Sequence, residues 1–453
     1  MDILINYVLP FVGMLVALIV IHEAGHYATA KMFGIKVLEA GIGYPPRAWG
    51  FTWRGTIYSL NWIPLGGFVR LLGEEDPSDP QSLAAAAAWK RLIVLGSGAV
   101  LNLMLPILLF AAVFMLPREV PTGPAMITGV APESPAEQAG LEPGDIIVAI
   151  NGYEVKNSLE AIRESRLNQG ERVNLTIRRT NDDGEVETIT LQAQSRWNPP
   201  PIEYTVQEGD DVRSVAELLA VSEGTVRAVA EIDTALEVDD VLLIETDEGV
   251  VEYRVRRGDS VEVVANRLDV SRDAVRDAAG LPDPDYLEPG TNLSIEQGPI
   301  GIGIGNQYGF TETEKHGFFE SFPKGWEATW DTLILFQKQI EAMFHGGGGP
   351  DFAGPVGIAQ TTGEVVKESG WKPLLELAAL LSLNLGIINL LPLPMLDGGR
   401  ITFVLIEIAR RGKRIAPEKE AIVHLVGLVL ILTMAVVITY FDVARLIAGD
   451  SLF

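Results

Sequence analysis

The chain has 453 residues, 47% of them hydrophobic, with a mean hydropathy of +0.22 and a net charge of −25. These values exclude a single soluble domain and indicate several domains with membrane segments. Residues 118–317 hold 17 Lys and Arg against 39 Asp and Glu, so one insertion carries most of the negative charge, which argues against nucleic-acid binding. The absence of cysteine excludes thiolate chemistry, disulfides and cysteine-ligated metals.

The first apolar run extends from Ile3 to Ile21 without a charge and can cross most of a hydrocarbon core of about 30 Å. It leads directly into an H-E-x-x-H pattern formed by His22, Glu23 and His26. On a helix this spacing places both imidazoles on one face, where they can bind Zn²⁺ with the glutamate beside them as general base. We therefore expect a metalloprotease centre at the far end of a membrane helix. A cleaved signal peptide is disfavoured, because no positive n-region precedes the run.

Three further apolar runs are long enough to span a membrane, namely Leu92 to Leu116, Leu374 to Leu396 and Ala421 to Tyr440. Basic residues concentrate in the loop between the first two spans and in the loop after the third. By the positive-inside rule both loops face the cytoplasm. Both termini and the acidic insertion are therefore expected outside, and the H-E-x-x-H pattern is expected toward the cytoplasmic leaflet.

The third run ends in Asn389-Leu-Leu-Pro-Leu-Pro-Met-Leu-Asp397-Gly-Gly. In the predicted topology the first and third spans end on the same side, so Asp397 falls at the depth of the two histidines. It can supply the third protein ligand of a tetrahedral zinc, which a water completes. Pro392 and Pro394 break the helix, which a membrane tolerates only where the freed backbone is buried in protein or lines a wet cavity. The simpler alternative is that Asp397 caps a helix before Gly398.

These motifs, with the insertion described below, resemble the site-2-protease family of intramembrane zinc metalloproteases, in the bacterial regulator-of-sigma-E protease subgroup. The resemblance implies that His22, His26 and Asp397 bind zinc and that Glu23 activates the zinc-bound water for attack on a peptide bond. It implies a place in the bacterial cytoplasmic (inner) membrane. The substrates would be single-pass membrane proteins such as anti-sigma factors or signal-peptide remnants, cut after a first cleavage outside. The residues that the resemblance places near the substrate are Asn389, Pro392, Pro394 and Asn102.

Between the first two spans, residues 41–72 alternate β-forming residues with Gly and Pro and predict a hairpin that turns at Arg54-Gly55. In the family this looks like the membrane-associated β-loop beside the active site. An exposed strand edge there can hold an unwound substrate segment by β-addition. The alternative is a hairpin that is only anchored at the membrane interface by Trp and Tyr.

Residues 124–200 contain Ala139-Gly-Leu-Glu-Pro-Gly-Asp-Ile-Ile-Val-Ala-Ile-Asn-Gly152, which is typical of a PDZ domain. The segment that matches a carboxylate-binding loop lies far downstream at Ile300, Gly301 and Ile302, so we expect a circularly permuted PDZ domain completed by residues 298–310. Such a domain binds a peptide end or strand. A purely structural β-domain is the alternative.

A repeat with a period of 49 to 51 residues splits this domain. Residues 204–210 match residues 253–259, and 241–245 match 291–296. Each unit reads strand, Gly-Asp turn, helix, helix, strand, so residues 203–246 and 252–297 resemble LysM modules, which bind N-acetylglucosamine glycans such as peptidoglycan. A structural or protein-docking role is the alternative. The possible glycan-binding residues are Gly209, Asp210, Gly258 and Asp259.

After the insertion, residues 318–358 are expected to form an interfacial amphipathic helix, Trp326 to Phe344, and a loop. His316, His345 and His424 have no partner at ligand spacing and are expected to be packing residues.

The sequence thus predicts a polytopic α-helical membrane protein with four transmembrane helices. Residues 1–117 and 371–453 form its membrane domain, which carries a membrane-associated β-hairpin. The extracytoplasmic insertion is an α+β PDZ domain with two LysM-like βααβ modules. A different class stays open, namely a catalytically silent membrane receptor or scaffold that binds peptides through the PDZ domain and cell-wall glycan through the LysM modules.

Overall fold

The computed structural model describes residues 9–448, apart from 75, 182, 220, 222, 231, 233–235, 237–239, 247–248, 257–260, 269, 282, 296, 309, 347–353, 355, 361 and 364–371. The chain divides into two compact units. The helical unit consists of residues 1–118, 314–333 and 350–453, and the β-rich unit consists of residues 119–313 and 334–349. Helix α9 (Phe318–Phe344) and the paired strands β3 (Arg118–Pro121) and β14 (Thr311–Glu314) contain the points where the chain passes between the units.

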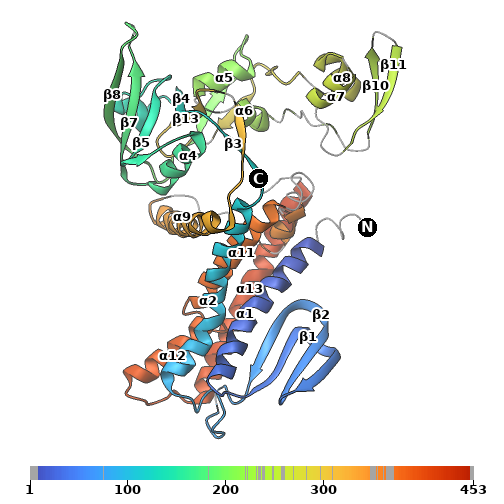
Figure 1. The fold of residues 1–453 in the computed structure, drawn as a ribbon, viewed down its shortest axis with the longest axis vertical. Helices are drawn as coiled ribbons and strands as arrows, with labels where there is room; N and C mark the ends of the chain where they lie inside the picture. Colours follow the sequence, from blue (N-terminus) through green and yellow to red (C-terminus); the bar gives the residue numbers. More distant parts are fainter. Residues whose placement is uncertain are drawn as a thin grey trace. The chain divides into compact units, whose positions relative to one another are not determined.

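The helical unit contains four helices long and apolar enough to cross a membrane. Each overlaps one of the four apolar runs, so the prediction of four membrane helices is confirmed. Helix α2 contacts α1, α11 and the short helix α12, and so lies at the centre of the unit (Figure 1). The helices of the unit are α1 (Leu9–Met32), α2 (Ala88–Phe114), α11 (Pro373–Leu390), α12 (Asp397–Ala409) and α13 (Pro417–Ala448).

Two helix ends differ from the predicted spans. Helix α1 continues beyond the H-E-x-x-H pattern to Met32, where Gly34 adopts a φ of +74° and Ile35 N–H donates to Ala30 O, as in a Schellman cap. Helix α11 stops at Leu390, inside the apolar run 374–396, where the sequence predicts a helix break at Pro392 and Pro394. The cause is Pro392, because the residue before a proline is driven out of the helical region, and Leu391 is extended with a ψ of 145°.

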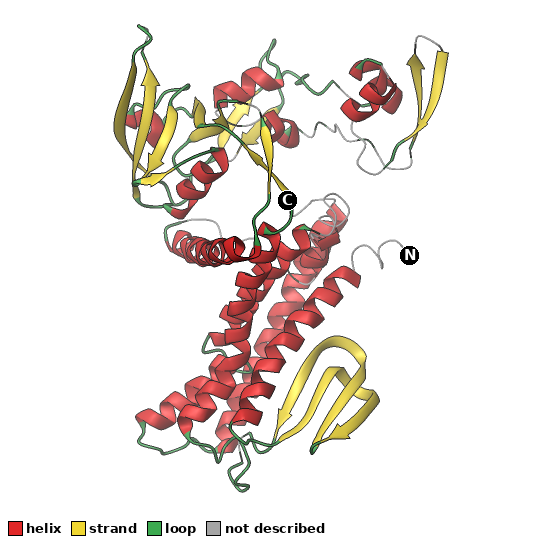
Figure 2. Cartoon of the chain, in the orientation of Figure 1, coloured by secondary structure: helices red, strands yellow, loops and turns green. Residues whose placement is uncertain are grey.

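Strands β1 (Val37–Trp53) and β2 (Thr56–Leu71) fold back on each other beside α1, and Figure 2 shows them as the strand structure of the helical unit. Residues 37–42 pair with residues 57–60 on one side and with residues 67–71 on the other. Residues 67–71 pair only with β1 among the described residues, so they form an edge. At the far edge, Trp49, Phe51 and Trp53 are exposed, as the predicted membrane-associated hairpin requires.

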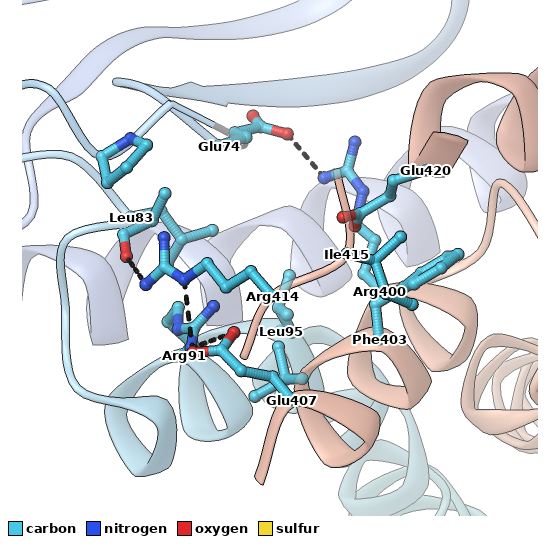
Figure 3. Close-up of a pocket in the computed structure, with 13 residues that line it drawn as sticks. Glu74, Leu83, Arg91, Leu95, Arg400, Phe403, Glu407, Arg414, Ile415 and Glu420 are labelled. Atoms are coloured by element: carbon cyan, nitrogen blue, oxygen red, sulfur yellow. Dashed lines mark hydrogen bonds and ion pairs between the residues drawn. The ribbon is translucent and has the colours of Figure 1, made fainter. Parts of the chain in front are cut away.

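A buried ion cluster ties α2 to α12. Arg91 Nη2 lies 2.7 Å from Glu407 Oε2, and Arg414 Nε lies 3.2 Å from Glu407 Oε1. The cluster lines a cavity of about 200 Å³, at whose rim Arg400 pairs with Glu74 (Figure 3). Burial alone would raise the pKa of Glu407, but the hydrogen bonds and charges of the two arginines outweigh it and hold this pKa below its ordinary value.

The β-rich unit is built on a sheet with the strand order β13-β4-β5-β7-β8, to which β6 adds beside β5. Strand β13 comes from beyond the repeats, yet it pairs with β4. The alternate residues that face inward, such as Ile127, Leu175 and Ile177, form the core. The elements are β4 (Ala125–Val130), α3 (Pro135–Ala139), β5 (Ile146–Ile150), β6 (Tyr153–Glu154), α4 (Ser158–Leu167), β7 (Arg172–Thr180), β8 (Val186–Gln194) and β13 (Ile302–Asn306).

The two repeats exchange strands. The first strand of one repeat pairs with the last strand of the other, because β9 pairs with β12 and β10 pairs with β11. The reason is that only residues 247–248 separate β10 from β11, and so short a connection favours a hairpin. Each pair covers its own core. The elements are β9 (Ile202–Thr205), α5 (Val212–Leu219), α6 (Glu223–Val229), β10 (Val241–Thr246), β11 (Gly249–Arg254), α7 (Val261–Leu268), α8 (Arg272–Ala279) and β12 (Asn292–Ile295).

Replacing Glu407 by Gln is expected to destabilise the helical unit by about 3 kcal/mol at pH 7, because Arg91 and Arg414 lose a largely buried anion. The pKa of Glu407 lies below that of an unfolded glutamate, about 4.3. The wild-type stabilisation is therefore complete above that pH and is lost as the pH falls through the lowered pKa. Thermal unfolding midpoints in detergent at pH 7 and about pH 3 measure the effect.

The exposed Glu418→Gln substitution is the control for that comparison and should leave both midpoints unchanged. A stability gap between wild type and Glu407→Gln that stays constant down to acidic pH would contradict the role of the Glu407 carboxylate.

Candidate active site

Three side chains from opposite ends of the chain meet inside the helical unit. His22 and His26 lie one turn apart on α1, and their Nε2 atoms are 3.1 Å apart. Asp397, the first residue of α12, places its Oδ2 3.0 Å from the first of these nitrogens and 3.2 Å from the second. The three side chains are only 9%, 12% and 17% exposed. The sequence-predicted ligand atoms thus form a nearly equilateral triangle in a buried site.

The triangle fits a tetrahedral metal ion. His26 Nδ1 lies 2.7 Å from Val94 O and must donate to it, so in the neutral ring Nε2 carries a lone pair. That lone pair faces Asp397 Oδ2, a buried atom with no hydrogen-bond partner among the described residues. A cation between these atoms would offset the repulsion between the lone pair on His26 Nε2 and the carboxylate oxygen of Asp397. Metal–ligand bonds of about 2.0–2.1 Å place tetrahedral ligands about 3.3 Å apart, close to the observed edges.

Two glycines allow α1 and α2 to approach at the site. A Cβ on Gly25 would lie 2.5 Å from Ser97 O, and a Cβ on Gly98 would lie 2.5 Å from His26 Nε2. Any larger residue at either position would force the helices apart or displace an imidazole. The glycine in H-E-A-G-H therefore has a packing role that the motif spacing alone does not reveal.

Asn102 of α2 holds the other nitrogen of His22. Its amide lies 3.3 Å from His22 Nδ1, the side chain is fully buried, and Asn102 Oδ1 has no partner among the described residues. With His22 Nε2 on a metal, Nδ1 carries the proton, and a half-turn of the amide brings its oxygen to that proton. Asn102 was expected near the substrate, but its burial leaves it no surface to offer and makes it a positioning residue for His22.

The backbone of Asp397 is held by the end of α11. A Cβ on Gly398 would collide with Leu391 O, and a Cβ on Gly399 would collide with Leu393 O. The two glycines that follow Asp397 thus allow the first turn of α12 to sit against the carbonyls of the preceding helix end. This contact fixes the height of the aspartate relative to α1.

Glu23 lies beside the triangle but outside it. Its carboxylate is half-buried and faces the edge segment of β2. Gly67, in the same segment, brings its Cα close enough that an added Cβ would lie 3.9 Å from Glu23 Cγ. The glutamate is therefore located between the metal ligands and an exposed strand edge.

Among the described residues, the remaining membrane-domain candidates make no hydrogen bond or ion pair with the triangle. Asn389 Nδ2 donates to Leu385 O of its own helix at 2.9 Å. Pro392 is exposed, and Pro394 packs against Gly427 of α13. These positions leave Asn389 and Pro392 accessible from outside the helix bundle.

In the β-rich unit, Ile300 is buried in the sheet core, where its side chain cannot bind a ligand. Gly301 has a φ of +81° and lies against Ser134, and Ile302 begins β13. The carbonyls of Ile300 and Gly301 accept hydrogen bonds from Ala136 and Ala131. Only the backbone of this loop remains for a peptide to contact.

In the first repeat, Gly209 is exposed with a φ of +96°. Asp210 Oδ2 accepts hydrogen bonds from Gln207 N–H and Tyr204 O–H, so this carboxylate is engaged in its own turn. The second pair of possible glycan-binding residues, Gly258 and Asp259, lies outside the described residues.

Two ionisable residues of α13 accept hydrogen bonds from the backbone of other segments. Asp442 is buried and accepts hydrogen bonds from the backbone N–H groups of Gly354 and Gly357, at 3.2 and 2.9 Å. His424, expected to be a packing residue, accepts a hydrogen bond from Met395 N–H. A signal was available, because an ionisable residue inside an apolar span is costly and marks function by default.

A two-histidine, one-carboxylate triangle with a neighbouring glutamate, built on helices long enough to span a membrane, defines a membrane zinc metalloprotease. A sequence model of "Peptidase family M50" matches residues 10–434, and the chain belongs to this family. The expected enzyme class and the expected zinc cofactor are thereby confirmed.

Curated relatives extend over almost the whole chain. A "Putative zinc metalloprotease" of Vibrio cholerae is 29% identical over 462 residues, which cover 98% of this chain and 100% of the relative. "Zinc metalloprotease RasP" of Oceanobacillus iheyensis is 25% identical over 523 residues, covering 97% and 99%. The similarity thus includes the membrane helices and the insertion together.

His22→Ala and Asp397→Ala are each expected to lose the zinc that the wild-type protein retains through purification, because a catalytic site with two protein ligands holds zinc weakly. Mass spectrometry of the detergent-purified proteins measures the metal per chain. His345→Ala, a substitution at an exposed histidine outside the triangle, is the matched control. Wild-type zinc content in either site variant would contradict the assignment.

Asn102→Ala is expected to weaken zinc binding by about 10- to 100-fold, because His22 loses the acceptor that fixes its tautomer. Asn102→Asp keeps an acceptor oxygen at the same position and should stay near the wild-type dissociation constant. Competition with a chelator of known affinity measures both. Equal zinc affinity in Asn102→Ala and wild type would show that the amide does not orient His22.

Proposed function

We propose that this protein is an intramembrane endopeptidase that hydrolyses transmembrane segments of single-pass membrane proteins. The observation that carries the proposal is that two members of the ligand triangle, His22 and His26, lie on α1, a helix with a mean hydropathy that suits a membrane span. A metal centre at that depth is within reach of a substrate helix and remote from soluble proteins.

Zinc bound by His22, His26 and Asp397 supplies Lewis acidity, which acidifies a water and polarises a peptide carbonyl. Glu23 accepts the proton of the attacking water and delivers it to the leaving amide nitrogen. Its half-buried position beside His22, outside the ligand set, leaves its carboxylate available for this transfer.

The edge segment of β2, residues 67–71, is the proposed docking site for the substrate backbone. A transmembrane helix hides its peptide bonds in internal hydrogen bonds, so a segment must become extended before hydrolysis. An extended segment that adds to this edge gains main-chain hydrogen bonds next to Glu23. Accessible Asn389 and Pro392 border the path on the α11 side.

The proposed substrate class rests on the family likeness, and the proposed orientation in the membrane rests on the distribution of basic residues. Anti-sigma factors or signal-peptide remnants, trimmed first by another protease, are the proposed substrates. The bacterial cytoplasmic membrane is the proposed location, with the termini and the acidic insertion outside. Arg91, at the start of α2, and Arg414, between α12 and α13, support this orientation, because the positive-inside rule assigns basic residues at these helix ends to the cytoplasm.

The β-rich unit is proposed to be a PDZ-type domain that carries two LysM-like modules. The joining of β13 to β4 supports the first part, since it completes the sheet with a strand from beyond the repeats. The repeat of two short helices on a two-stranded sheet supports the second. A glycan ligand would contact the exposed backbone near Gly209, because Asp210 is already engaged.

A catalytically silent receptor finds no support, because all three ligands and the glutamate are present and the chain belongs to a peptidase family. Peptide binding and glycan binding by the insertion would then determine which substrates are cleaved and when cleavage occurs.

Glu23→Gln is expected to retain zinc and to lower cleavage of a membrane-helix fusion by at least about 10³-fold, because the amide cannot take up the proton. Cleavage is measured by the appearance of product in detergent, with zinc content determined on the same sample. Glu418→Gln, an exposed change of the same type, should cleave like wild type. Substantial cleavage by Glu23→Gln would refute the assigned role of this residue.

A further inference from the structure

The loop that precedes Asp397 makes a hydrogen bond to His424 of α13. Met395 N–H donates to His424 Nδ1 at 2.9 Å. His424 is 7% exposed, and Met395 precedes Asp397 by two residues. Because a backbone N–H can only donate, Nδ1 must present its lone pair, and the ring is neutral with its proton on Nε2.

The loop has few other means of satisfying its backbone. Of residues 391–396, Pro392 and Pro394 have no N–H. The N–H groups of Leu391, Leu393 and Leu396 donate within the loop or to the end of α11. Among the described residues of this loop, Met395 is thus the position whose N–H donates to α13.

The conformation at Met395 needs an external restraint. Its φ is +73°, in the left-handed region that non-glycine residues seldom occupy. Such a conformation costs on the order of 1–3 kcal/mol and persists only where the surroundings impose it. A hydrogen bond from the same residue to a buried imidazole is a restraint of this kind.

A glycine on α13 allows this helix to approach the loop before Asp397 closely. Gly427 lies one turn beyond His424 on the same face, and any Cβ there would collide with Pro394. The His424 ring also packs against Phe403 of α12, with 5.4 Å between the ring centroids. The imidazole therefore sits between the loop and the helix that begins at Asp397.

We propose that His424 is a positioning residue for the zinc centre, which holds Met395 and thereby sets the location of the Asp397 carboxylate. It does not touch the metal or the substrate. Its contribution is the acceptor at Nδ1, whereas its ring contact with Phe403 is a separate packing role. The proposal concerns metal binding and is independent of which substrate the enzyme cuts.

Two substitutions separate the two roles. His424→Asn places an amide oxygen where Nδ1 lies and keeps the acceptor, but it removes the ring. His424→Phe keeps a ring against Phe403 and removes the acceptor. Displacing a metal ligand through its supporting hydrogen bonds typically weakens metal binding 10- to 100-fold. We expect a zinc dissociation constant raised at least about tenfold in His424→Phe and within about threefold of wild type in His424→Asn.

The experiment is zinc competition with a chelator on the detergent-purified full-length proteins, together with the unfolding midpoint of each zinc-free form. The expected result is weak zinc binding only in His424→Phe, with zinc-free midpoints of all three proteins within a few degrees. Wild-type affinity in His424→Phe would overturn the proposal. So would equal loss in both variants, or a loss in His424→Phe accompanied by a lower zinc-free midpoint, since either would indicate packing alone.

Discussion

Electron pairs on three buried atoms repel one another at a separation of about 3 Å unless a cation lies between them. The helical unit holds such a set, because His22 and His26 come from α1, and Asp397 comes from the start of α12. The glycine contacts that bring α1 against α2, and α12 against the end of α11, all serve to maintain this arrangement. A zinc ion bound between these atoms would stabilise a helix packing that is unfavourable without it.

Much of the fold could be predicted from local sequence. The four membrane helices follow from hydropathy, which depends on composition over some twenty residues. The break that ends α11 was predicted at Pro392, whereas the continuation of α1 to a cap at Gly34 was not predicted, although Gly34 is a readable end signal. The exchange of strands between the repeats was not foreseen, because internal similarity shows which segments are equivalent but not which of them pair. Which strands pair depends on the length of the loops that connect them and on which strands and helices share a hydrophobic core.

The meeting of His22, His26 and Asp397 could be predicted from the sequence. The spacing of His22 and His26 is a property of one helix, and the depth of Asp397 follows from counting spans. The partners behind them were assigned differently, with Asn102 expected at the substrate and His424 in packing. Those roles depend on which face of α2 or α13 turns toward the site, and a nearly uniform apolar helix has no hydrophobic periodicity to reveal it.

The strand exchange makes the repeats a nested pair instead of a tandem one. Strands β10 and β11 with α7 and α8 form a closed inner module, and the chain of this module is enclosed by β9 and β12 of the outer one. A truncation at the boundary of the sequence repeat, near residue 250, would leave each half with an unpaired strand and an open core. The segments that can be removed or transplanted intact are the inner module alone, or both modules as a single block.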